Sequence, residues 1–125
     1  MKTAFLLAAT ILAAPLHAQQ EPGELPLDER AQILSAEAVA KDMQNPNRPG
    51  EAEISPLYPV KGGYKMCATT DAYNSSGTYI GRDYWEVTLD ESGQEVVSTR
   101  DVTGLNSPCY GADYKPFERL IEGAK

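Results

Sequence analysis

The chain has 125 residues, of which 18 are acidic and 11 are basic, and its formal net charge at pH 7 is −7. The charges are scattered and form no basic patch, so nucleic acid and anionic membrane surfaces are poor partners for it. An acidic surface that keeps the protein soluble is favoured over one that binds a basic partner, and the second alternative stays open.

Residues 1–18 have the features of a secretory signal peptide. Lys2 supplies a charged start, residues 4–14 form an apolar run, and Leu16-His17-Ala18 is a candidate cleavage site. The run is shorter than the roughly 20 residues that a membrane-spanning helix needs, which favours cleavage over a membrane anchor. We therefore expect a periplasmic or secreted protein with no membrane anchor after cleavage. Loss of Lys2 leaves 10 of the 11 basic residues against 18 acidic ones, a net charge near −8.

The mature part of the chain is expected to hold a flexible leader at 19–27 and a single domain at 28–125. The leader is polar and contains two prolines and a glycine. A helix is predicted to begin at Asp28, a natural N-cap, and to end at Asn45-Pro46. This helix is expected to cover a sheet, with an amphipathic helix that binds a partner as the alternative. Its apolar positions recur at helical spacing: Ile33, Leu34, Ala36, Ala38, Val39, Ala40 and Met43.

Strands are predicted after this helix, beginning with a short edge strand at 51–55. Residues 64–73 and 78–89 alternate in polarity around the polar loop 74–77, where Gly77 suits a positive φ, and they predict a β-hairpin. Gly81 is expected to mark a bulge. A turn at 90–93 leads to a third strand at 94–99, and a short helix is predicted at 116–122, with Phe117, Leu120 and Ile121 as its apolar stripe.

The two cysteines, Cys67 and Cys109, are predicted to form a disulfide, because the chain is exported and contains no Cys-x-x-Cys motif. Alternation places Cys67 on the face opposite Met66 and Ala68. Either the two helical segments must then cover different faces of the sheet, or a bulge near Gly62-Gly63 must shift the strand's phase.

Catalytic chemistry is poorly supported by the sequence. The only histidine, His17, lies in the signal peptide, which excludes Ser-His and Cys-His nucleophile pairs and typical zinc sites from the mature chain. The remaining candidates are the carboxylates of Asp71, Asp83 and Glu86, and exposed acids near strand ends are ordinary. No catalytic residue, metal ligand or cofactor is therefore assigned, and the protein is expected not to be an enzyme.

Aromatic residues are concentrated in the predicted hairpin. They can pack across strands, which is favoured, or bind a protein or a sugar. Tyr73 and Tyr84 are the best candidates for exposure because they fall on the more polar faces. The tentative binding residues are Tyr73, Asn74, Tyr79, Tyr84 and Trp85.

The order of these segments resembles a group of small exported bacterial proteins of uncharacterised function. The resemblance rests on a helix ending in Asn45-Pro46, the strand 64–68 (YKMCA) and the hairpin 71–81 (DAYNSSGTYIG). Ala68 stands where the group usually has glycine. The resemblance implies a bacterial envelope location and a helix packed on an antiparallel sheet, and it supplies no catalytic residues.

These observations predict an α+β fold with three or four antiparallel strands, an N-terminal helix on the sheet, and a C-terminal segment tied back by the disulfide. The predicted function is that of a non-enzymatic envelope module. It would bind another envelope protein or cell-wall glycan through the hairpin aromatics. The alternative is a secreted inhibitor of a hydrolase.

Overall fold

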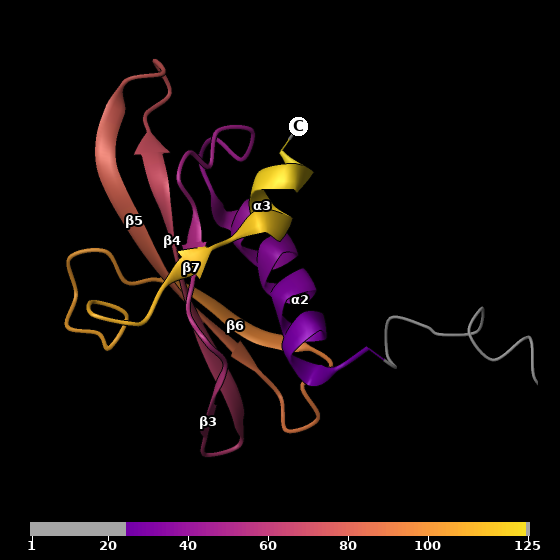
Figure 1. Cartoon of the computed structure of the whole chain (residues 1–125). Helices are drawn as coiled ribbons and strands as arrows, with labels where there is room; N and C mark the ends of the chain where they lie inside the picture. The colour runs from indigo at the N-terminus through magenta and orange to yellow at the C-terminus, as the bar shows by residue number, and fades with distance from the viewer. Residues whose placement is uncertain (1–24, 125) are drawn as a thin grey trace, which may run out of the picture.

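The computed structural model describes residues 25–124, so the predicted signal peptide and most of the predicted leader lie outside the described residues. It shows an α+β fold in which a helix packs on an antiparallel sheet, as predicted (Figure 1). The elements in chain order are α2 (Leu27–Asp42), β2 (Glu53–Ile54), β3 (Tyr58–Val60), β4 (Gly63–Tyr73), β5 (Tyr79–Leu89), β6 (Val96–Asp101), β7 (Lys115–Pro116) and α3 (Glu118–Gly123).

The sheet has six strands, in the order β6-β5-β4-β2-β7, and β3 pairs with the start of β4. Strands β4 and β5 form the long predicted hairpin and stay paired from Tyr64 opposite Leu89 to Tyr73 opposite Tyr79. The strand predicted at 51–55 is present as β2, but the prediction that it lies at the edge of the sheet was wrong. Strand β2 lies between β4 and β7, because the C-terminal segment returns and adds the two-residue β7 outside it.

The hairpin contains the predicted bulge. Ala72 lies opposite Gly81, whereas Tyr73 lies opposite Tyr79, so Ile80 is an extra residue without a partner on β4. Gly81 has a φ of +119°, which is a left-handed conformation that glycine adopts without a steric penalty. The bulge confirms the prediction made from Gly81.

One face of the sheet, called here the helix face, carries the main core. Side chains of β4 and β5 at alternate positions meet the buried side of α2, and Phe117 and Leu120 from the C-terminal segment join them. The helix stripe differs from the prediction, because Ser35 is fully buried whereas Ile33 is only half-buried and lies outside the core cluster. The helix also begins one residue early, at Leu27, so Asp28 lies in its first turn and Pro26 occupies the N-cap position.

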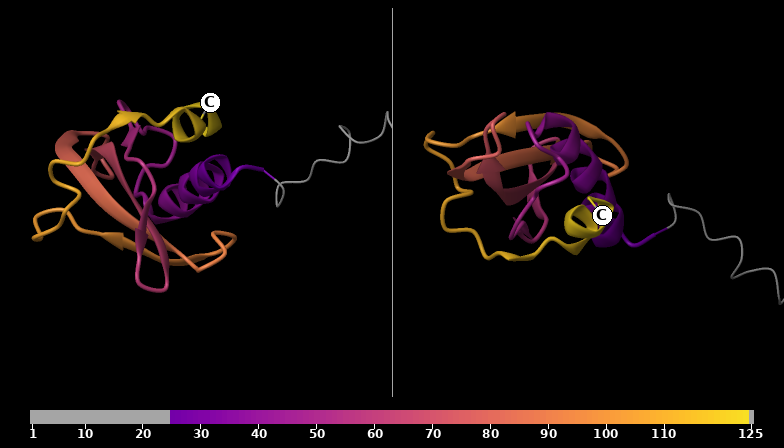
Figure 2. Two further views of the ribbon diagram at one scale, coloured as in Figure 1. Left: turned by 60° about the horizontal axis from the view of Figure 1, so that its bottom comes forward. Right: turned by 90° about the horizontal axis from the view of Figure 1, so that it is seen from above.

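The opposite face, called here the disulfide face, is covered by residues 102–114. Cys67 and Cys109 form the predicted disulfide and are buried with Val102. Neither arrangement that the sequence suggested for covering Cys67 is correct. Both helices lie on the helix face, where they contact each other (Figure 2), and the β4–β5 register shifts only near Ala72. A loop without helix or strand covers the second face instead.

Candidate functional site at the hairpin tip

The outer part of the β4–β5 hairpin, residues 70–83, is called here the distal hairpin, and its loop is a tight turn. The backbone N–H of Gly77 donates to the carbonyl oxygen of Asn74 at 2.9 Å, and Gly77 has a φ of +84°. The side-chain oxygen of Asn74 accepts from the N–H groups of Ser76 at 2.9 Å and Thr78 at 3.0 Å. Asn74, predicted as a binding residue, therefore uses this oxygen to shape the turn.

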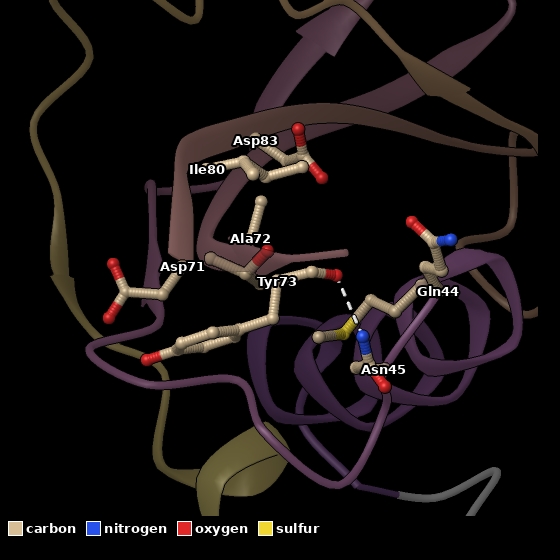
Figure 3. A pocket seen from close by; sticks show the side chains of 9 residues that line it. Gln44, Asn45, Asp71, Ala72, Tyr73, Ile80 and Asp83 are labelled. Carbon is tan, nitrogen blue, oxygen red and sulfur yellow. Dashed lines mark hydrogen bonds between the residues drawn. The ribbon is translucent and has the colours of Figure 1, made fainter. Parts of the chain in front are cut away.

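The loop that follows α2 braces the distal hairpin. The side-chain Nδ2 of Asn45 donates to the carbonyl oxygens of Tyr73 at 2.7 Å and Asn74 at 3.1 Å, and Figure 3 shows the Asn45 side chain directed at the Tyr73 carbonyl. The N–H of Asp71 donates to the carbonyl oxygen of Pro49 at 3.0 Å. Two segments far apart in sequence are thus joined by hydrogen bonds to backbone groups of the hairpin, which fix the position of its tip.

Three side chains form an aromatic and cationic cluster at the tip, called here the tip cluster: Arg48, Tyr73 and Tyr79. The guanidinium carbon of Arg48 lies 3.8 Å from the centre of the Tyr73 ring, a cation–π contact, and its Nη1 donates to the carbonyl oxygen of Gly77 at 3.3 Å. The rings of Tyr73 and Tyr79 meet edge to face with centres 5.6 Å apart. Tyr79 remains 53% exposed and its neighbour Ile80 60% exposed. The cluster is therefore ordered by internal contacts and still accessible.

An ion-pair network lies below the tip. Arg82 donates from Nη1 to the Asp71 carboxylate at 2.9 Å, and its Nη2 lies 3.5 Å from the Glu53 carboxylate. The second oxygen of Asp71 accepts from the N–H of Glu51 at 3.1 Å. The Asp71 carboxylate is thus held by the Arg82 guanidinium and the Glu51 backbone amide, and these contacts give it a role in holding the fold together.

The three carboxylates that the sequence offered for catalysis do not converge. Paired residues of neighbouring strands project from the same face, so Asp83, opposite Thr70, lies on the helix face. Asp71 and Glu86 lie on the disulfide face, opposite Arg82 and Cys67. Burial, together with the negative charge of Asp101, raises the pKa of Asp83, and a hydrogen bond from Thr103 opposes this rise. Residues 25–124 contain no group of three or more side chains suited to hold a metal ion.

The hollows near the hairpin differ in size and character. The cavity in Figure 3, beside Asn45 and Tyr73, has a volume of about 30 Å³, which is room for roughly two water molecules. A more open groove of about 340 Å³ runs beside the disulfide, and its lining of Pro56, Tyr58 and Pro108 is almost wholly apolar. Specific small-molecule sites combine an apolar pocket with converging polar groups, and neither of these two hollows has that character.

The predicted binding residues divide into two groups. The structure brings Tyr73 and Tyr79 together at the tip. Tyr84 is half-buried five residues farther along β5, where its ring lies 4.3 Å from that of Tyr110. Trp85 was wrongly predicted as a binding residue. It is only 2% exposed, and its indole N–H donates to the hydroxyl of Thr70 inside the core at 3.4 Å.

Sequence reasoning missed Arg48 and Asn45 as parts of the site. Both lie in the loop after α2, which shows no regular pattern. The available signal was the placement of a cation and a helix-ending Asn-Pro pair shortly before an aromatic hairpin.

No protein-family model, curated protein or solved structure matches the chain. The case for a function therefore rests on the geometry of the tip. Within the part of the chain that the structure describes, neither helix has the length and apolar character that crossing a bilayer demands.

Proposed function

We propose that this protein is a non-enzymatic binding module of the bacterial envelope, periplasmic or secreted, that holds a partner protein against the tip cluster. The observation that carries this proposal is the packing of Arg48 on Tyr73 beside the exposed ring of Tyr79. Tyrosine and arginine are among the residue types that contribute most at protein interfaces. The buried disulfide supports export, because such bonds persist in oxidising compartments.

Rigidity favours binding at this tip. A partner that binds a mobile loop must order it first, at a cost of about 0.5–1.5 kcal/mol for each flexible side chain. Here the Asn45 side chain and the turn made by Asn74 already fix the backbone, and Arg48 is held by its bond to Gly77. Much of the ordering cost is therefore met within the free protein.

A protein partner fits better than cell-wall glycan. A sugar ring stacks on the open face of an aromatic ring, but Arg48 already lies over the Tyr73 ring and Tyr79 contacts it as well. Tyr79 is the only ring of the tip cluster with most of its surface free. Glycan binding through stacking would thus be limited to one tyrosine.

A second candidate function is inhibition of a hydrolase by the loop 102–108. Its Leu105 is 51% exposed, and the loop is tied at one end by the disulfide and at the other by a backbone bond from Val102 to Tyr84 of 2.8 Å. A braced loop with an exposed apolar side chain is a shape that can enter an enzyme cleft.

Site-specific photo-crosslinking distinguishes these functions. A photoreactive phenylalanine analogue is placed at Tyr79, at Leu105, or at Val97, which is equally exposed on β6 and serves as the control. The three variants are irradiated in cells of the organism that encodes the protein. The proposal expects one discrete protein adduct from position 79 and none from 97. An adduct from 105 alone supports the inhibitor, and the absence of adducts from 79 refutes tip binding.

A further inference from the structure

The outer edge of β5 is only partly covered. Strand β6 pairs with β5 from Trp85, opposite Asp101, to Leu89. One step farther, the backbone carbonyl oxygen of Tyr84 accepts from the N–H of Val102 at 2.8 Å. The backbone N–H of Tyr84 donates to the side-chain hydroxyl of Thr103, also at 2.8 Å. Among the described residues, no strand pairs with residues 79–83 on this side. Figure 1 shows that β4 is the only described strand beside the upper part of β5.

The hydrogen-bond pattern identifies which backbone groups face this open edge. Along an antiparallel strand, successive residues direct their N–H and C=O groups to alternate sides. Tyr84 directs both groups toward the β6 side, so Arg82 directs its own toward the same side. The opposite strand agrees, because Asp71, the partner of Arg82, uses its N–H on the far side to bond Pro49. Arg82 therefore offers one donor and one acceptor at the open edge.

The side chains beside this edge differ in charge and polarity along the strand. On the helix face, Asp83 lies near Asp101, and no described cation forms an ion pair with either carboxylate. Ile80 lines the same small cavity as Asp83 and is mostly exposed. Arg82 is already paired with two carboxylates across the sheet. The edge thus combines a free backbone pair, an uncompensated negative charge and an apolar side chain.

We propose that residues 79–83 bind an extended segment of a partner protein as an added antiparallel strand. The segment has the pattern Lys or Arg, then any residue, then an apolar residue. The middle residue lies opposite Arg82 and exchanges two backbone hydrogen bonds with it. The basic residue lies opposite Asp83, and the apolar residue reaches Ile80. This inference rests on the proposed function and names the chemistry of the partner that the tip cluster would hold.

The same edge does not suit a second copy of this chain. A two-fold antiparallel pairing must be centred on Arg82, because that residue carries the free backbone pair. It would place the two Arg82 side chains directly opposite each other, and like charges in directly opposed positions are destabilising. Each copy also carries a net charge of −7. A basic strand from another protein meets neither obstacle.

The test uses two capped peptides, KTITV and ETITV, which differ only in the residue placed opposite Asp83 and begin there because β6 and Val102 already cover Trp85 and Tyr84. Each is titrated into the oxidised protein, and binding and the hydrogen exchange of the Arg82 amide are followed by NMR. The lysine peptide should bind roughly three- to tenfold more tightly than the glutamate peptide and slow exchange at Arg82, as an exposed ion pair exchanged for a repulsion predicts. Asp83→Lys should reverse the preference. Glu91→Lys, which makes the same charge change at an exposed residue of the 90–93 turn, should leave it unchanged.

The outcomes separate this inference from the proposed function. If position 79 forms a protein adduct but neither peptide slows exchange at Arg82, the tip binds a partner without strand addition and the inference is overturned. If adducts and peptide binding are both absent, both proposals fail. Slow exchange at Arg82 that depends on protein concentration alone, with dimers in sedimentation, would make the occupant a second copy and also overturn the inference.

Discussion

Replacement of Glu86 by glutamine tests whether a buried carboxylate helps to hold the C-terminal loop on the sheet. Glu86 is 6% exposed, and its two oxygens accept from the Ser107 hydroxyl at 2.8 Å and the Lys65 ammonium at 3.2 Å. Arg100 lies 3.9 Å away but is largely exposed, so solvent screens it. The variant weakens two charge-assisted bonds, each worth about 1.5–3 kcal/mol, although the amide oxygen retains one acceptor. We expect a loss of about 2 kcal/mol in the free energy of unfolding at pH 7.

The pH dependence of this loss of stability shows whether the charge of Glu86 causes it. Burial alone would raise the pKa of Glu86, but the hydrogen bonds from Ser107 and Lys65 and the charges of Lys65 and Arg100 lower it below its usual value. A carboxyl group with a lowered pKa in the folded state stabilises the protein above its unfolded pKa. That contribution is lost as the pH falls through the folded pKa. The difference between wild type and Glu86→Gln should therefore shrink on acidification and vanish once Glu86 is protonated in both states.

The assay is urea unfolding at pH 7 and pH 3, followed by the fluorescence of Trp85, the only tryptophan, with the disulfide intact. Glu91→Gln, at an exposed residue of the 90–93 turn, is the matched control and should not change stability at either pH. If Glu86→Gln destabilises the protein equally at both values, its effect comes from packing rather than charge, and the reasoning is refuted.

Replacing both cysteines with alanine should lower the free energy of unfolding by about 4 kcal/mol, because the disulfide closes a loop between positions 42 apart; a loss below about 1 kcal/mol in urea unfolding would contradict this. Asp83→Asn should raise the melting temperature at pH 7 and leave it unchanged at pH 3. The raised pKa of Asp83 means that its ionisation costs stability as the pH rises, and a lower melting temperature at pH 7 would contradict that sign. Arg48→Ala should weaken crosslinking from position 79 while costing less than about 1 kcal/mol in the free energy of unfolding. The control Lys61→Ala, in the exposed β3–β4 turn, should change neither crosslinking nor stability. Equal crosslinking by the two variants would show that Arg48 is not part of the site.

The parts of the fold that depend on local sequence were predictable. The β4–β5 hairpin follows from alternation, a polar loop and glycines at 77 and 81, whose positive φ values need no tertiary contact. The disulfide followed from there being two cysteines in a chain with a predicted export signal. In this alternation Trp85 falls on the same face as Val87 and Leu89, and that face is the core. The suggestion that Trp85 binds a partner was wrong because it relied on residue type, whereas the alternation already placed this side chain among apolar neighbours.

The parts that depend on tertiary contacts were not predictable from local pattern. Ser35 is buried in place of a larger apolar residue because α2 approaches the sheet closely there, and its hydroxyl contacts the Met66 sulfur at 3.5 Å. Strand β7 consists of Lys115 and Pro116, neither of which favours strands, and it forms only because β2 offers it an edge. Likewise, Arg48 reaches Tyr73 only because Pro49 is bonded to β4.

The arrangement of contacts separates the part of the hairpin that stabilises the fold from the part that is proposed to bind a partner. In the half near Cys67, α2 covers one face, the disulfide-tied loop covers the other, and β6 covers the outer edge. Strand β6 ends at Asp101 because Val102 turns into the core beside Cys109, and this turn leaves the edge of the distal hairpin open. The bulge at Ile80 then adds an exposed apolar side chain at that edge. Substitutions near Cys67 should consequently change stability first. Substitutions on the tip side of Tyr84, at residues 79–83, should change binding with little loss of stability.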